Sequence, residues 1–147
     1  GTQLDAFARQ FMWKAGINYG HGTGHGVGHF LNVHEGPHQF RMNHVPALLL
    51  PGMTITNEPG IYKAGRHGVR TENTMLIVQS QRTEFGDFYK FEPLTLCPID
   101  KEAIHAEMLT DEEKGWLNKY HRQVYEQLCP MLNAEEQAWL KQATSAI

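Results

Sequence analysis

Gly20-His21-Gly22-Thr23-Gly24-His25-Gly26-Val27-Gly28 is a stretch in which every second residue is glycine. Glycine at this density disfavours a helix, because it leaves the backbone too free, and it is typical of loops or of very tight backbone paths. The stretch also opens a histidine-rich region, since six of the nine histidines fall between positions 21 and 44. It therefore predicts a loop around which histidines gather.

Three functional interpretations compete for His21, His25 and His29. A zinc-binding helix would need a glutamate directly after the first histidine, where Gly22 stands. A phosphate-binding loop would need GxGxxG or GxxxxGK[ST] spacing, which strict alternation of glycine does not provide. The third is an active-site loop whose glycines let the backbone pass close to a substrate or a metal, because neutral imidazole binds divalent transition metals well. On the loop alone, a glycine-rich turn with solvated histidines is equally compatible with the sequence.

The sequence before this loop predicts an amphipathic helix that ends at Gly16, a typical C-terminal cap. Its apolar side carries Leu4, Phe7, Ala8, Phe11 and Ala15, and its polar side carries Asp5, Arg9, Gln10 and Lys14. After the loop, strands are expected at residues 30–33, 53–57, 68–72, 74–78 and 88–97, with turns at residues 36–37 and 51–52.

Two capping boxes mark the start of helices in the last third of the chain. Thr110 with Glu113 precedes a stripe of Leu117, Tyr120, Val124 and Leu128 that ends at Pro130, and Asn133 with Glu136 precedes a second helix. One helix, a block of strands and a helical tail predict an α+β fold, divided into residues 1–99 and 100–147.

Two glutamates lie at strand ends. Glu58 shares parity with Thr54 and Thr56, so it is expected on the polar face of its strand. Arg70 and Glu72 also share a face, and an arginine beside a carboxylate keeps it ionised and fixes its rotamer. Taken alone, that pair is better explained as a surface ion pair worth about 0–1 kcal/mol.

The composition excludes several classes of protein. The 147 residues are 41% apolar and 20% charged, and the net charge of −3 gives no reason to expect nucleic acid or a membrane as partner. No run approaches the roughly 20 apolar residues of a membrane span, and no signal peptide is visible, so a cytoplasmic protein is expected. Cys97 and Cys129 could form one disulfide, but two unrelated thiols are favoured.

Four segments resemble, in order and spacing, the signature segments of Xaa-Pro aminopeptidases, which are metallopeptidases of the pita-bread fold. They are His21-Gly-Thr-Gly-His25-Gly-Val-Gly28, Phe30-Leu-Asn-Val-His34-Glu-Gly-Pro37, Glu58-Pro-Gly60 and Gly68-Val-Arg-Thr-Glu72-Asn73. The resemblance continues into residues 91–96 and the helical tail around Trp116. It implies the C-terminal half of a pita-bread domain, with a curved antiparallel sheet and helices, followed by a helical extension.

The resemblance also implies a role for individual residues. His25 would bind one metal, Glu58 would bind one metal near the attacking water, and Glu72 would bridge two metals. His21 and His34 would line the substrate site, with His34 placed to hydrogen-bond the scissile amide, and Arg70 would orient Glu72. The implied cofactors are two Mn(II) ions, with Co(II) or Zn(II) also compatible, and the implied substrate is a peptide with proline in second position. His29, His38, His44 and His67 match no role.

The family's site also uses two aspartates and a further histidine upstream of the glycine-rich loop. Only 20 residues precede His21, and Asp5 is their only acidic residue. The isolated chain is therefore expected to be inactive and to bind Mn(II) weakly or not at all. An apolar face left uncovered should cause association into a homodimer or a larger assembly. A prolidase-like dipeptidase and a non-catalytic pita-bread module that binds peptide or protein are the alternatives.

Overall fold

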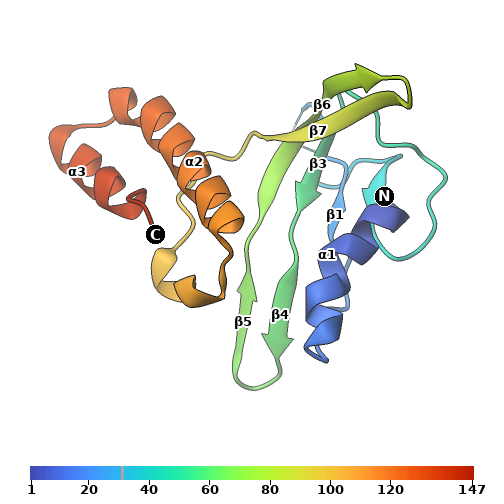
Figure 1. The fold of residues 1–147 in the computed structure, drawn as a ribbon, viewed down its shortest axis with the longest axis horizontal. Helices are drawn as coiled ribbons and strands as arrows, with labels where there is room; N and C mark the ends of the chain where they lie inside the picture. The colour runs from blue at the N-terminus through green and yellow to red at the C-terminus, as the bar shows by residue number, and fades with distance from the viewer. Residues whose placement is uncertain (31) are drawn as a thin grey trace. The chain divides into compact units, whose positions relative to one another are not determined.

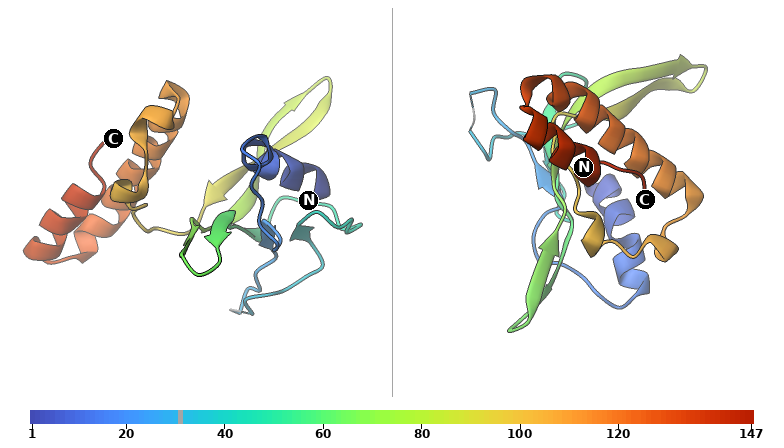
Figure 2. Two further views of the ribbon diagram at one scale, coloured as in Figure 1. Left: turned by 90° about the horizontal axis from the view of Figure 1, so that it is seen from below. Right: turned by 90° about the vertical axis from the view of Figure 1, so that its left-hand side faces the viewer.

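The computed structural model describes residues 1–30 and 32–147. They form two compact units, residues 1–95 and residues 96–147, whose elements are shown in Figures 1 and 2. The first unit contains one helix and all of the strands, and the second contains the remaining helices. The predicted α+β composition is thus present, and each unit is described by itself.

The first helix, α1, spans Thr2–Lys14 and ends as the sequence predicts. Gly16 follows the helix with φ of 72°, a left-handed conformation that glycine adopts without steric cost. The amide of Gly16 donates to the carbonyl of Trp13, and the amide of Ile17 donates to that of Met12, which is the hydrogen-bond pattern of a Schellman motif.

The burial of several side chains of α1 is opposite to what the amphipathic pattern predicts. Asp5 and Arg9 on the polar side are 1% and 0% exposed, whereas Phe7 and Phe11 on the apolar side are each 66% exposed. The prediction that the polar side faces solvent is wrong at these positions. Asp5 and Arg9 neutralise each other through an ion pair of 2.7 Å, which makes their burial tolerable.

A three-stranded antiparallel sheet forms the centre of the first unit. It consists of β3 (Thr54–Asn57), β6 (Asn73–Thr83) and β7 (Gly86–Pro93), in the order β3-β6-β7. In Figure 1 the long strands β6 and β7 rise beside β3 as a twisted ribbon. A core of Phe40, Ile55, Met75 and Ile77 packs on this sheet, with Ala8 of α1 beside it.

Two shorter strand pairs flank the sheet. The hairpin of β4 (Gly60–Lys63) and β5 (His67–Arg70) turns at Gly65, whose φ is 68°, and β1 (Gly24–His25) pairs with β2 (Gln39–Phe40). The strand predicted at residues 68–72 therefore ends at Arg70, and the one predicted at residues 88–97 ends at Pro93, because proline cannot donate to a further ladder bond. The short strands β1, β2 and β4 were not predicted.

The strand predicted at residues 30–33 is wrong for its described residues. Phe30 lies in a turn, Val33 in a bend, and Asn32 in irregular chain, while Leu31 lies outside the described residues. The reason is a hydrogen bond within the segment, because the amide of Gly28 donates to the carbonyl of Asn32 over 2.7 Å.

The second unit consists of two α-helices and three short 3₁₀ turns. Helix α2 spans Asp111–Leu128, α3 spans Ala134–Ala143, and the turns are η1 (Lys101–Ala103), η2 (Ala106–Met108) and η3 (Cys129–Met131). Both predicted capping boxes are present. The core contains Tyr120, Val124 and Leu140. Both cysteines are free thiols, and none of the described helices is long and apolar enough to span a membrane.

Candidate metal centre

The glycines at positions 24 and 26 let the loop pass between two other segments. A Cβ atom on Gly24 would collide with the carbonyl oxygen of Thr56 in β3, and one on Gly26 would collide with the carbonyl oxygen of Glu35. Gly26 also bridges Ile55, which fixes the loop beside β3. Backbone therefore packs against backbone on both sides of His25, which explains why glycine occupies positions 24 and 26.

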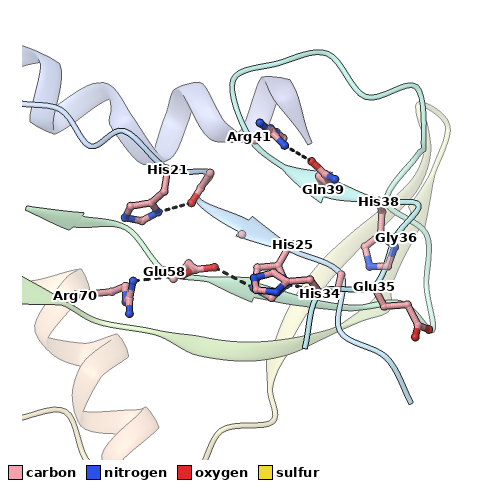
Figure 3. A pocket seen from close by; sticks show the side chains of 13 residues that line it. His21, His25, His34, Glu35, Gly36, His38, Gln39, Arg41, Glu58 and Arg70 are labelled. Atoms are coloured by element: carbon pink, nitrogen blue, oxygen red, sulfur yellow. Dashed lines mark hydrogen bonds and ion pairs between the residues drawn. The ribbon is translucent and has the colours of Figure 1, made fainter. Parts of the chain in front are cut away.

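This arrangement forms one wall of a half-open cavity of about 410 Å³ (Figure 3). The cavity collects residues from the loop, from the segment after it, and from the ends of β3 and β5. The lining residues are His21, Gly22, Gly24, His25, Gly26, His34, Glu35, Gly36, His38, Gln39, Arg41, Glu58 and Arg70.

His25 and Glu58 point toward each other across this cavity (Figure 3). The Nδ1 atom of His25 lies 2.9 Å from the carbonyl oxygen of Gly26, and that oxygen can only accept, so Nδ1 carries the donated proton. The Nε2 atom lies 3.2 Å from Oε1 of Glu58. In a neutral imidazole this places a bare nitrogen lone pair against a carboxylate oxygen, which is unfavourable unless a cation, either a proton on Nε2 or a metal ion, lies between them.

Arg70 lies between the two glutamates. Its Nη1 atom is 3.9 Å from Oε2 of Glu58, and its Nε atom is 3.6 Å from Oε2 of Glu72. Glu72 is 41% exposed and follows the end of β5, whereas Glu58 is only 13% exposed. The structure thus brings His25 and Glu58 into direct contact and connects Glu72 to them through Arg70. Within the described residues, no three histidine, cysteine or acidic side chains are grouped closely enough to hold a metal ion.

His21 is held in the cavity by two contacts. Its Nδ1 atom donates to the carbonyl oxygen of Gly22 over 2.7 Å, and its Nε2 atom accepts from the hydroxyl of Tyr62 over 2.9 Å. Tyr62 also lies 3.5 Å from Nη1 of Arg70, so it connects the loop with the arginine. Sequence reasoning missed Tyr62. The available signal was the pair Gly60 and Gly68, because a Cβ at either position would collide with the ring of Tyr62.

His34 and His38 differ in their surroundings. His34 is exposed, and its ring centre lies 4.2 Å from that of His25 at the cavity wall. His38 is buried, and its Nε2 atom donates to the carbonyl oxygen of Thr54 over 2.7 Å, so it supports the strand beneath the cavity. His29, His44 and His67 do not line the cavity.

A buried ion pair on α1 holds the start of the loop. Arg9 donates through Nη1 to the carbonyl of Tyr19 and through Nη2 to the carbonyl of His21, over 2.7 and 2.6 Å. Asp5 accepts from the hydroxyl of Thr23 over 2.6 Å. These contacts fix the backbone on both sides of Gly22. The sequence signal was the spacing of four residues between Asp5 and Arg9, which is that of a helical ion pair.

The chain matches a metallopeptidase family and its peptide-cleaving members. Residues 1–79 match the metallopeptidase family M24, and residues 87–147 match the C-terminal region of peptidase M24. The chain is 44% identical to a probable Xaa-Pro aminopeptidase P of Coprinopsis cinerea and 46% identical to aminopeptidase P1 of Arabidopsis thaliana. Each match covers 100% of this chain but only 25% and 24% of the relative, so the chain spans about a quarter of the length of these relatives.

Solved structures give the same family and the fold. The X-prolyl aminopeptidase of Caenorhabditis elegans, described as a cytosolic enzyme with a di-nuclear active site, matches with a TM-score of 0.91 at 36% identity, over 99% of this chain and 24% of that one. A dipeptidase of Pyrococcus horikoshii matches with a TM-score of 0.50 at 38% identity, over 64% of this chain and 23% of that one. The predicted α+β, pita-bread fold is confirmed. Because the family match covers more than half of its residues, the chain belongs to metallopeptidase family M24.

Proposed function

We propose that the chain supplies part of the dinuclear metal centre of an Xaa-Pro aminopeptidase, which removes the first residue of peptides that have proline second. The observation that carries this proposal is the 3.2 Å approach of Nε2 of His25 to Oε1 of Glu58, with Nδ1 of the same ring committed to a carbonyl. A ring fixed in this way directs its free nitrogen at a cation, which is how metal-binding histidines are held in proteins.

The donor atoms fit divalent transition metals. His25, Glu58 and Glu72 would hold the ions, and one imidazole among carboxylates suits Mn(II), while Co(II) and Zn(II) are also compatible. Two such ions would supply a water of lowered pKa and would offset the charge that develops on the scissile carbonyl.

The other cavity residues act on the ligands and on the substrate. Arg70 orients both carboxylates, with its Nη1 atom 3.9 Å from Glu58 and its Nε atom 3.6 Å from Glu72. His34, exposed at the cavity wall beside the ring of His25, is free to donate a hydrogen bond to the peptide at the bond that is cut. His21 lines the site and is held still by Gly22 and Tyr62.

Two alternatives have less support. A prolidase-like dipeptidase is the first alternative, but the match to the dipeptidase of Pyrococcus horikoshii covers 64% of the chain against 99% for the aminopeptidase of Caenorhabditis elegans. A non-catalytic module that binds peptide or protein would be expected to lose ligands, whereas His25, Glu58 and Glu72 are all retained.

Further properties follow from the same proposal. Residues 1–99 would be the C-terminal half of the catalytic domain and residues 100–147 a helical extension of it. The 147 residues alone would be inactive and would bind Mn(II) weakly or not at all, because three ligands cannot hold two ions. A cytoplasmic location is supported by the cytosolic relative of Caenorhabditis elegans.

The decisive experiment uses the chain extended upstream to the length of its relatives and loaded with Mn(II). We expect it to release the first residue from peptides with proline second, and His25→Ala or Glu58→Gln to lower kcat by at least about 100-fold, more than the loss of an outer partner of a ligand costs. His44→Ala is the matched control, because His44 is exposed and does not line the cavity.

Each other outcome would favour a different function. Cleavage of dipeptides alone would identify a prolidase-like enzyme, and tight peptide binding without cleavage would identify a binding module. Efficient hydrolysis by the 147 residues alone, free of contaminating peptidases, would contradict the proposed dependence on further ligands.

A further inference from the structure

Thr56 connects the two side chains that meet in the cavity. It lies in β3 and is 3% exposed. Its Oγ1 atom accepts from the backbone amide of His25 over 3.0 Å and lies 3.1 Å from Oε1 of Glu58. His25 and Glu58 therefore touch each other directly and are also joined through a single hydroxyl group.

The direction of these hydrogen bonds is forced. A backbone amide can only donate, so the amide of His25 occupies an acceptor position on the hydroxyl of Thr56. The one hydroxyl proton is then directed at Oε1 of Glu58, which must accept it. That oxygen has a second lone pair, and it faces Nε2 of His25 at 3.2 Å.

His25 and Thr56 lie 31 residues apart in the chain. The loop reaches β3 only because Gly24 has no Cβ to collide with the carbonyl of Thr56. The hydroxyl of Thr56 thus aligns the glycine-rich loop with β3. The same hydroxyl also contacts the carboxylate of Glu58, which follows that strand.

We propose that Thr56 is a positioning residue, whose hydroxyl sets the separation of His25 and Glu58 before a metal ion binds. This inference rests on the proposed function, in which His25 and Glu58 bind the metal. Without the hydroxyl, the amide of His25 loses this partner. Among the described residues, the carboxylate of Glu58 then keeps only its contacts with His25 and Arg70, so His25 and Glu58 no longer share one anchor.

The chain provides a matched control in Thr54. It lies two residues away on the same strand, and its hydroxyl donates to the carbonyl of Val27 in the same loop over 2.6 Å. It has no hydrogen bond to His25 or Glu58 among those that the described residues form. Thr54→Val therefore removes one contact between strand and loop, as Thr56→Val does, but leaves the link between the two ligands intact.

The first measurement uses the metal-free 147-residue chain and NMR. Thr56→Val should shift the amide and ring resonances of His25 and accelerate exchange of its amide proton roughly fivefold, the factor that loss of one net hydrogen bond gives. Thr56→Ser should restore both signals. Thr54→Val should shift the resonances around Val27 and leave those of His25 in place.

The second measurement is metal affinity, taken with Mn(II) on the chain extended to the length of its relatives. Thr56→Val should weaken binding by about 10- to 100-fold, as the loss of outer partners of metal ligands does. Thr56→Ser and Thr54→Val should stay close to the parent protein. At saturating Mn(II), the kcat of Thr56→Val should lie closer to that of the parent protein than its affinity for Mn(II) does.

Equal effects of Thr54→Val and Thr56→Val, or an unchanged His25 amide in Thr56→Val, would overturn the proposal. If Thr56→Val does not fold, Thr56→Cys gives the same comparison, because a thiol is a weak hydrogen-bonding group. An extended wild-type protein that neither binds metal nor cleaves peptides would refute the proposed function, and the metal-free measurement would still decide the role of Thr56.

Discussion

The guanidinium group of Arg9 donates through all three of its nitrogen atoms while it is 0% exposed. Its partners are Asp5, two backbone carbonyls, and Oδ1 of Asn18 at 2.9 Å. When a buried carboxylate loses its positively charged partner, the free-energy cost of removing the carboxylate from water is no longer offset. Arg9 therefore affects both the stability of the first unit and the position of the loop.

We expect Arg9→Met to lower the free energy of unfolding of residues 1–95 by about 3–5 kcal/mol, because Asp5 would remain as an unpaired buried charge. Urea unfolding would measure this through the fluorescence of Trp13, after Trp116 and Trp139 are replaced by phenylalanine. The double variant with Asp5→Asn should lose less than the sum of the single losses. A loss below about 1 kcal/mol would show that water reaches Asp5.

Individual site residues were predictable to different extents. Strand parity places Glu58 and Thr56 on one face, and their hydrogen bond of 3.1 Å agrees with it. The link from Thr56 to the amide of His25 was not predictable, because it joins residues 31 positions apart through a backbone atom. The burial of Asp5 likewise depends partly on a distant residue, because Thr23 donates to it in addition to Arg9 of its own helix.

The helices were predictable because their signals are local. Gly16 ends α1, and the capping boxes at Thr110 and Asn133 begin α2 and α3. The short strands β1 and β2 have two residues each. They exist only because they pair with one another, although they lie apart in the sequence. No local propensity marks a strand of that length, so β1 was included in the predicted loop.

Helix α2 carries a histidine that should make the second unit sensitive to acid. His121 is 0% exposed, its Nε2 atom accepts from the amide of Ile99 over 3.0 Å, and its Nδ1 atom has no partner in the described part of the chain. Burial, and to a lesser extent the positive charge of Lys101, hold the pKa of His121 below its usual value of 6.5. The folded state therefore favours the neutral ring.

The sign of the pH effect follows from that lowered pKa. The stabilisation is present above about pH 6.5, the pKa of an unfolded histidine, and it is lost as the pH falls through the lowered pKa of the folded state. Urea unfolding, followed by the fluorescence of Trp116 and Trp139, should show the free energy of unfolding decrease as the pH is lowered from 7.5. His121→Gln should flatten the dependence, whereas His105→Gln, at an exposed position, should not. A wild-type protein of constant stability over that range would contradict the expectation.

At the scale of the whole molecule, the first unit presents a large apolar surface on α1. Phe7 and Phe11 are each 66% exposed and Leu4 is 36% exposed, and their spacing places them on one face of the helix. Burial of a phenylalanine side chain contributes about 1.5–3 kcal/mol, so such a surface favours association. The exposed phenylalanines of α1 thus have a consequence for the state of the chain in solution.

We expect the chain to form a homodimer or a larger assembly through this surface. Sedimentation velocity should show Phe7→Glu with Phe11→Glu shifting the protein toward the monomer, because two charges would be buried in the contact. Phe85→Glu is the control, since Phe85 is 85% exposed on the same unit but lies between β6 and β7. A monodisperse wild-type monomer at high concentration would refute this expectation.

The β4–β5 hairpin has a further consequence for protein engineering. Glu58 precedes the hairpin and Glu72 follows it, and Gly60 pairs with Arg70 at its base. The spacing of the two carboxylates is therefore set at the base of the hairpin, where Gly60 pairs with Arg70. It does not depend on the number of residues in the turn at the other end. The turn at Gly65 is accordingly a natural insertion point, where a label or a binding tag could be added without altering the spacing of Glu58 and Glu72.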